Sequence, residues 1–342
     1  MAADAPAKTA RFDARHELKI VVPEGAKKLR VWFAMPQDDP AQTVSDFKVE
    51  APFKHQITTD LQGNKMVYLE VIQAPQKEFS VIETFKVTRR EQRTDLKAVK
   101  PTKLSESDRQ KFATELSPNV NVVIDDRIRG LSAQIVGNEK DPILAARKLY
   151  NWTLENIDYW VKDPKNKKAS PVGSTEYCLT TKTGNCTDFH SLWTSLARPA
   201  GLPTRMVYGS FFKKELDGQD MDQSYHCWPE FYVAGIGWVP HDVAIADIFA
   251  GDFQMNADNE KLVRLTTADG YKGADPAKVD YYFGNIDERR VTWSRGRDLT
   301  LSPKQDGGPV NALAKAYVEV DGKVRAEKEL WTRKLTFREI AP

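Results

Sequence analysis

Three residues of the types used in nucleophilic catalysis follow one another along the chain: Cys186, His226 and Asp242. Gly184 lies just before the cysteine and apolar residues at helical spacing follow it, which predicts a helix beginning at or just before Cys186. The unpaired N–H groups and the positive end of a helix N-terminus stabilise a thiolate, the reactive form of cysteine. Those N–H groups are also candidate donors to the oxyanion of a tetrahedral intermediate. A small buried cysteine at a helix start is the competing interpretation.

His226 and Asp242 supply the two other groups that a cysteine nucleophile uses. His226 stands in the aromatic segment YHCWPEFY, which predicts a strand with the imidazole near its start, and a thiol needs such a base because it is mostly protonated at neutral pH. Asp242 ends the segment GWVPHD, one strand later, where a carboxylate can bond the far imidazole nitrogen and fix its tautomer. Each residue alone is more often structural. In this order and spacing, the three predict a Cys–His–Asp triad.

Two further polar residues fall in the helix that is predicted after Cys186. His190 follows it by four positions, one turn later, and could contact it, although local packing or capping is the more common place for such a histidine. Asp188 is expected to orient the adjoining loop.

Cys227 and His241 are the immediate neighbours of His226 and Asp242. Because adjacent strand residues point to opposite faces, both are expected to lie outside the site. Cys178 and Cys227 are a candidate disulfide in an oxidising compartment. Three cysteines are too few for a disulfide scaffold and lack metal-ligand spacing, so their clustering indicates chemistry.

The elements that would position these residues change along the chain. Alternating apolar residues and short turns over residues 12–90 predict antiparallel strands in a small β-sandwich. A polar linker with Pro101 follows, and then Asp125 and the pair Asp141-Pro142 are signals for helix starts. Consecutive strands are predicted next, at residues 205–212, 227–233 and 237–239. Helices followed by antiparallel strands favour an α+β fold over an α/β fold.

These patterns predict three segments. Residues 1–100 form an N-terminal β-sandwich-like domain, and residues 101–285 form the catalytic core, with helices packed on an antiparallel sheet. Residues 286–342 contribute β-strands that either extend the core or pack on the first domain. The strands of this last segment are predicted at residues 291–293, 299–301, 316–320 and 335–337, with Asp321-Gly322 as a hairpin turn.

The bulk composition excludes several classes of protein. A formal net charge of +2 argues against a nucleic-acid-binding protein. No apolar run approaches the ~18–20 residues that cross a bilayer. The first residues, MAADAPAKTA, lack the apolar core of a signal peptide and are typical of a mature exported protein, so a periplasmic or extracellular location is expected, with the cytoplasm as the alternative. No calcium loop or other metal motif occurs, and neither a metal nor a cofactor is expected.

Three segments, GNCTDF, HCWPEFY and GWVPHD, resemble the signature blocks of the transglutaminase-like superfamily. RPAGLPTR, at residues 198–205, resembles the segment between the first two blocks in bacterial members. The resemblance covers residues 120–245, and the preceding β-region resembles, more weakly, a β-domain of bacterial proteins of the group. It implies a papain-like α+β core with Cys186, His226 and Asp242 as the triad. Trp228 and Glu230 match motif positions that provide packing and structural support.

The resemblance also implies acyl transfer through a thioester on Cys186. Hydrolysis of an amide in a protein or peptide substrate is favoured over cross-linking, since many bacterial members are peptidase-like. Glutamine-dependent amine transfer is the second possibility, and a binding scaffold without activity is the third. The substrate and the oligomeric state are left open.

Overall fold

The computed structural model describes residues 6–98, 100, 102–267 and 271–341. Residues 1–5 of the alanine-rich start, and Pro101 of the expected linker, lie outside the described residues. The chain forms two compact units. Met1–Glu91, Tyr208–Tyr225 and Asp287–Pro342 make the first, and Gln92–Val207 and His226–Ile286 make the second. The division of the chain into three segments, with boundaries at residues 100 and 286, stays a prediction.

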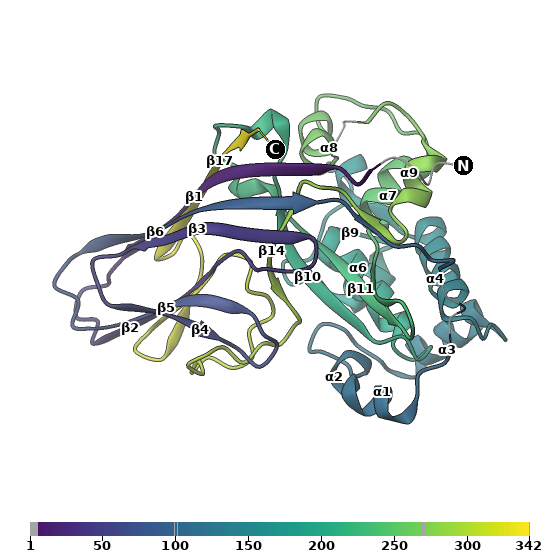
Figure 1. The fold of residues 1–342 in the computed structure, drawn as a ribbon, viewed down its shortest axis with the longest axis horizontal. Helices are drawn as coiled ribbons and strands as arrows, with labels where there is room; N and C mark the ends of the chain where they lie inside the picture. Colours follow the sequence, from purple (N-terminus) through teal and green to yellow (C-terminus); the bar gives the residue numbers. More distant parts are fainter. Residues whose placement is uncertain (1–5, 99, 101, 268–270, 342) are drawn as a thin grey trace. The chain divides into compact units, whose positions relative to one another are not determined.

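Two antiparallel sheets make up most of the first unit, with strand orders β17-β1-β6-β3 and β16-β15-β2-β5-β4 (Figure 1). Alternate residues of β1 are buried, and Leu18 shares an apolar cluster with Val31 and Leu69 of the other sheet. The strands are β1 (Thr9–Val21), β2 (Lys28–Ala34), β3 (Gln42–Glu50), β4 (His55–Thr59), β5 (Lys65–Ile72), β6 (Glu78–Arg90), β15 (Ala316–Val320), β16 (Lys323–Arg325) and β17 (Trp331–Ile340). The unit also holds β14 (Arg290–Arg295) and the turns η2 (Lys214–Leu216) and η3 (Asp222–Ser224).

The C-terminal strands of this unit pair with N-terminal ones, β17 with β1 and β15 with β2. Asp321 and Gly322 have φ values of 49° and 76° and join β15 to β16, which confirms the predicted hairpin turn. The strand predicted at residues 299–301 is wrong, because Leu299 forms only an isolated bridge with Val310. The sequence-based prediction lacks β3 and β4, whose residues are mostly half-buried or exposed and give no clear apolar alternation.

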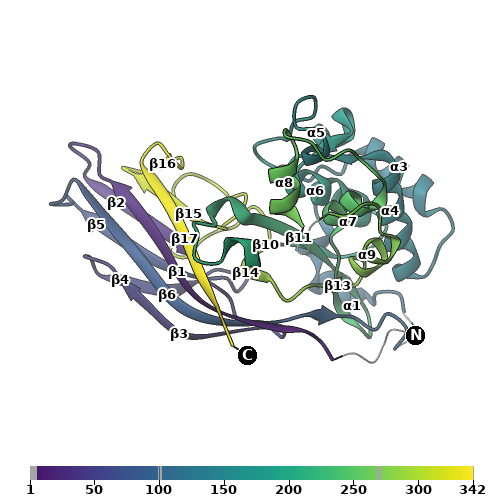
Figure 2. The same ribbon diagram turned by 90° about the horizontal axis from the view of Figure 1, so that it is seen from above.

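The second unit contains the helices, and α6 lies at its centre. All 12 residues of α6 are buried, and α3, α4, α5 and α7 contact it (Figure 2). Asp125 and Asp141 cap α3 and α4 through hydrogen bonds to backbone N–H groups, which confirms both predicted helix starts. The helices are α1 (Glu106–Lys111), α2 (Ala113–Leu116), α3 (Asp126–Val136), α4 (Pro142–Asn156), α5 (Thr175–Thr181), α6 (Cys186–Ala197), α7 (Val243–Ala250), α8 (Glu260–Thr266) and α9 (Pro276–Tyr281), with the turn η1 (Trp160–Lys162).

The strands that follow α6 confirm the predicted succession. β10 (Thr204–Phe211) lies next to β11 (Tyr225–Val233), which pairs with β12 (Gly237–Pro240) in antiparallel register. Two shorter pairs add to it: β8 (Asp158–Tyr159) runs parallel to β9 (Thr183–Gly184), and β7 (Gln92–Arg93) runs antiparallel to β13 (Asn285–Ile286). Helices and antiparallel strands in this arrangement confirm the α+β class. In the described part of the chain, no helix is both long and apolar enough to span a membrane.

Candidate active site

The start of α6 is fixed by a reciprocal set of hydrogen bonds. The Asn185 side chain accepts from the N–H of Thr187 at 2.9 Å and from that of Asp188 at 3.1 Å. The Asp188 carboxylate accepts in turn from the Asn185 N–H at 3.0 Å. This capping box makes Cys186 the first residue of the helix, as the sequence predicts.

Asp188 also holds the loop that precedes α5. Its carboxylate accepts from the N–H groups of Ser170 and Ser174 at 3.0 and 2.8 Å, and from the Ser170 hydroxyl. The backbone at Gly184 approaches the first turn of α6 so closely that a Cβ atom on Gly184 would lie 2.4 Å from Cβ of Asp188. The glycine before Cys186 is therefore required by the packing, and Asp188 orients the loop as expected.

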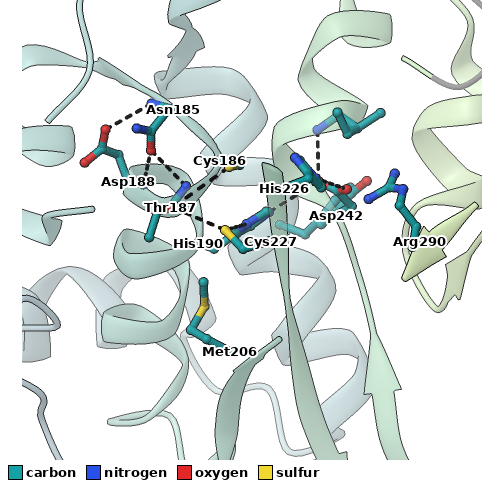
Figure 3. A network of polar contacts seen from close by, with 12 residues as sticks. Asn185, Cys186, Thr187, Asp188, His190, Met206, His226, Cys227, Asp242 and Arg290 are labelled. Carbon is teal, nitrogen blue, oxygen red and sulfur yellow. Dashed lines mark hydrogen bonds and ion pairs between the residues drawn. The ribbon is translucent and has the colours of Figure 1, made fainter. Parts of the chain in front are cut away.

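His226 and Asp242 face each other from β11 and from the start of α7 (Figure 3). Nε2 of His226 lies 2.7 Å from Oδ2 of Asp242. The Asp242 N–H donates to the Tyr282 carbonyl at 2.8 Å, and its Oδ1 caps α7 by accepting from the Ile245 N–H at 3.0 Å. Because Asp242 occupies Nε2, the other ring nitrogen, Nδ1, is the one available to the Cys186 sulfur. The structure thus brings together the three residues that the sequence predicts as a triad.

The thiol and the imidazole are almost completely buried, with Cys186 4% and His226 3% exposed. A hydrogen bond from Cys227 lowers the pKa of Cys186 well below its usual value; burial opposes this, and the charge of His226 adds to it. Burial lowers the pKa of His226, but Asp242 and the Cys186 thiolate outweigh burial and raise that pKa to about 9. At neutral pH the site therefore holds a thiolate beside an imidazolium.

Cys227 lies at the site, which corrects the expectation that it lies outside. Its thiol hydrogen-bonds Cys186 and lies 3.4 Å from the Thr187 hydroxyl and 3.6 Å from Nδ1 of His190. These three partners all belong to α6, so the side chain of Cys227 points at that helix, whereas His226 reaches the start of α7. Alternation along β11 does separate the two side chains. The sulfur at the helix start is nevertheless within reach of both.

Replacing Cys227 with Ala is expected to raise the pKa of Cys186, because the hydrogen bond from Cys227 is the main cause of its low value. Each unit of increase leaves about tenfold less thiolate at acidic pH. The measurement is the pH dependence of Cys186 alkylation by iodoacetamide. Cys227→Ser restores a hydrogen-bond donor and should recover most of the lost rate. Superimposable pH profiles for the wild type and the Ala variant would contradict this assignment.

His190, His241 and Cys178 have different surroundings. Nε2 of His190 lies 3.4 Å from Oδ1 of Asp242, so His190 contacts the carboxylate of the predicted triad. The His241 ring packs 4.0 Å from that of Trp193, and burial lowers its pKa, which keeps it neutral. All three cysteines are free thiols, so the candidate disulfide between Cys178 and Cys227 is not formed.

Tyr159 is a site residue that the sequence-based prediction lacks. It is 2% exposed, and its hydroxyl hydrogen-bonds Cys186. Its strand, β8, has only two residues and pairs with Thr183 and Gly184 of β9. No periodic pattern marks so short a strand, and the only sequence signal is an aromatic residue between a predicted helix and a polar loop.

The motif positions Trp228 and Glu230 lie away from the sulfur, on β11. Trp228 is buried in a cluster with Val207 and Ile286. Glu230 pairs with Arg205 of β10 at 2.7 Å. Both contacts agree with the expectation that these two residues provide packing and structural support. Within the described ranges, no group of three or more His, Cys, Asp or Glu side chains is arranged to hold a metal ion.

Comparisons with known proteins agree with this fold. An uncharacterized protein of Haemophilus influenzae is 29% identical over 226 residues, which cover 60% of this chain and 56% of that protein, so the match spans little more than half of the relative's length. The crystal structure of a Cytophaga hutchinsonii protein, described as a candidate cysteine protease, superposes with a TM-score of 0.57 and 16% identity over 97% of this chain and 98% of that one. At this identity, the likeness shows the fold alone.

Residues 129–243, which run from α3 to the start of α7, match the sequence family described as the Transglutaminase-like superfamily. This range contains the start of α6, strand β11 and Asp242. Its three motif segments are the ones that bring the cysteine, the histidine and the aspartate together. The segment that holds Cys186, His226 and Asp242 is therefore similar in sequence to the transglutaminase-like superfamily.

Proposed function

We propose that this protein is a thiol enzyme that breaks amide bonds through a thioester on Cys186. The observation that carries the proposal is the position of His226 between the Cys186 sulfur and the Asp242 carboxylate. The site is buried, the pKa of the cysteine is lowered and the pKa of the histidine is raised. Such a pair supplies a nucleophile and a general acid at neutral pH without any cofactor.

The reaction has two halves, formation of the thioester and its hydrolysis, and all three side chains take part in both. The Cys186 thiolate attacks the carbonyl carbon, a C–S bond forms, and the carbonyl electrons move to the oxygen. When the intermediate collapses, the C–N bond breaks and His226 gives its proton to the departing amine. His226, now neutral, takes a proton from water, whose oxygen attacks the thioester carbon. The C–S bond then breaks, which releases the acid and restores the Cys186 thiolate beside the protonated His226. Asp242 holds the imidazole in one tautomer throughout.

Hydrolysis of a protein or peptide amide is the proposed reaction, and amine transfer is the second candidate. Support for hydrolysis comes from the resemblance to peptidase-like bacterial proteins and from the fold shared with the Cytophaga protein described as a candidate cysteine protease. A second amine in place of water would give transamidation by the same steps. An exported location remains a prediction.

The proposal is tested by profiling the protein against a peptide library and against glutamine substrates with an added amine, with the Cys186→Ala protein as the blank. Hydrolysed peptides and a thioester adduct on Cys186, detected by mass spectrometry, are expected. Incorporation of the amine in preference to water would replace hydrolysis with transfer. If iodoacetamide failed to label Cys186 in the native protein under conditions that label a papain-like control, the enzyme proposal would be wrong and a binding scaffold would take its place.

The pH dependence of amide cleavage is expected to show an alkaline limb near pH 9. His226 must be protonated to release the amine, and its pKa is raised to about 9, so the rate should hold through neutral pH and fall as pH rises through that value. The measurement is kcat/KM against pH for a cleaved amide. A p-nitrophenyl ester, whose leaving group needs no proton, should show a weaker limb. A limb near the ordinary histidine value of ~6.5 would contradict the raised pKa.

A further inference from the structure

His190 is a buried histidine that the proposed reaction does not use, although it lies on α6 one turn after Cys186. Its Nδ1 lies 3.6 Å from the Cys227 sulfur on β11, and its Nε2 lies 3.4 Å from Oδ1 of Asp242 (Figure 3). Its ring stands edge-on to that of His226, with 6.2 Å between centroids. A second imidazole therefore reaches both elements that hold the base of Cys186.

The two oxygens of Asp242 face different imidazoles. Oδ2 lies 2.7 Å from Nε2 of His226, whereas Oδ1 accepts from the Ile245 N–H at 3.0 Å and faces Nε2 of His190. A ring nitrogen with a bare lone pair would repel a carboxylate oxygen, so the Nε2 of His190 carries a hydrogen. At 3.4 Å this contact is long for a hydrogen bond, and its effect on Asp242 is mainly electrostatic.

The elements packed around His190 carry several other ionisable groups. They are Cys227 and His226 of β11, His241, Asp242 and Asp247 at and near α7, Tyr150 of α4, Tyr159 of β8, Cys178 of α5 and Cys186 of α6 itself. Helix α3 buries no ionisable side chain. Burial favours the neutral form of five of these groups, because it raises the pKa of the thiols and phenols and lowers that of the imidazole: Cys178, Cys227, Tyr150, Tyr159 and His241.

The charged groups are then few. Asp247 pairs with Lys162 at 2.7 Å, which leaves His226, Asp242 and the Cys186 thiolate as the charged groups of this set. Of these three, Asp242 is the one whose side chain the ring of His190 contacts. Any electrostatic effect of His190 on the base is therefore exerted through that carboxylate.

The strength of the Asp242–His226 pair matters for the chemistry. Burial lowers the pKa of His226, but Asp242 and the Cys186 thiolate outweigh burial and raise that pKa to about 9. A general acid works best when its pKa lies near the operating pH, because it has to release its proton as well as hold it. A donor on the other oxygen of Asp242 compensates part of the negative charge and weakens its attraction for the imidazolium.

We propose that His190 is a positioning residue, whose Nε2–H shares the Asp242 carboxylate with His226 and limits the hold of that carboxylate on the imidazolium proton. His190 acts through Asp242 and does not touch the substrate. The catalytic consequence rests on the proposed function, because His226 has to release its proton only if an amide is cleaved. The sharing of the carboxylate does not depend on any reaction.

The test uses two substitutions that each keep one of the two ring nitrogens. His190→Asn keeps a nitrogen near the place of Nδ1, which faces Cys227, and loses the one that faces Asp242. His190→Gln places its amide nitrogen near Nε2 and keeps the donor to Asp242. The titration of His226 is followed by NMR in protein labelled with ¹³C-histidine. The chain has five histidines, and the signal missing from His226→Asn is that of His226.

His190→Asn is expected to raise the pKa of His226 by roughly one unit, which is a tenfold tighter hold on the proton. His190→Gln should titrate close to the wild type. A merely structural role would loosen Asp242 and lower the pKa of His226 instead, since Asp242 raises it. His241→Asn is the matched control: this second buried ring packs 4.0 Å from Trp193, and its replacement should leave the titration of His226 unaltered.

An unchanged or lowered pKa of His226 in His190→Asn would overturn the proposal, and so would an equal rise in the Asn and Gln variants. Should His190→Asn fail to fold, His190→Leu, which fills the apolar volume and has neither nitrogen, gives the same comparison. The alkaline limb of kcat/KM should move with the pKa measured by NMR. A protein that shows the expected titrations but cleaves no amide would refute the proposed function and leave the shared carboxylate standing.

Discussion

Cys186→Ala is expected to abolish amide cleavage while leaving the protein folded. Removing the nucleophile of an acyl-transfer enzyme costs on the order of 10⁶-fold in kcat. The fold should survive because the bonds that start α6 belong to Asn185 and Asp188, and alanine is an excellent residue in the first turn of a helix. The variant also loses a buried negative charge, and this removes a desolvation cost that offsets the lost contacts of the sulfur. Its melting temperature should therefore stay within about 4 °C of the wild type, the shift that ~1 kcal/mol produces in a protein of this size.

Cys178→Ala is the matched control for that variant. Cys178 is a free, fully buried thiol on α5, and burial raises its pKa. Its replacement should cost stability through the small cavity left behind and leave kcat/KM unchanged. Turnover by Cys186→Ala at the wild-type rate, on a substrate that the wild type cleaves, would remove the basis for thioester chemistry.

Asp242→Asn is expected to lower kcat/KM by about 10³–10⁴-fold, as the loss of the orienting carboxylate does in serine proteases. Two effects combine. The amide favours the wrong imidazole tautomer, and the main contribution that raises the pKa of His226 disappears with the charge. The alkaline limb of the pH profile should therefore move from near 9 toward lower pH. Measuring kcat/KM against pH for both proteins tests the two effects separately.

The structure allows this change to be made without disturbing the helix. Asp242 is the N-cap of α7, and asparagine caps helices as well as aspartate does. Asp242→Ala loses both roles and should be destabilised by about 1 kcal/mol more than the Asn variant. Asp141→Asn makes the same chemical change at the cap of α4 and should leave kcat/KM unaltered. A wild-type pH profile in Asp242→Asn would show that the carboxylate does not govern His226.

Local patterns predict the positions of Cys186, His226 and Asp242 because each one stands at or near the end of a strongly patterned element. The apolar stripe after Cys186 marks α6, the aromatic segment marks β11, and Asp242 lies two positions after the end of β12. In each case the nearby sequence determines both the element and where it begins or ends. The α+β class follows from the same elements, taken in their order along the chain.

Contacts between distant segments are not encoded in such patterns. Cys227 is expected outside the site because alternation says only which face of the strand a residue occupies, and α6 lies over the face to which Cys227 points. Tyr159 depends on a two-residue parallel pair and on Asp247, which lies 88 positions away along the chain. Both placements come from tertiary packing, which a single sequence shows only after the fold is known.

Helix α7 joins two parts of this site. It starts at Asp242, which orients His226, and one turn later it carries Asp247, which holds the Tyr159 backbone and pairs with Lys162 at 2.7 Å. A change that rotates or shifts this short helix would move the carboxylate and the phenol together. Evolution therefore cannot adjust the orientation of His226 and the position of Tyr159 independently through α7. Substitutions there should affect both side chains at once, so changes that adapt the proposed activity to new substrates are expected to accumulate elsewhere in the chain.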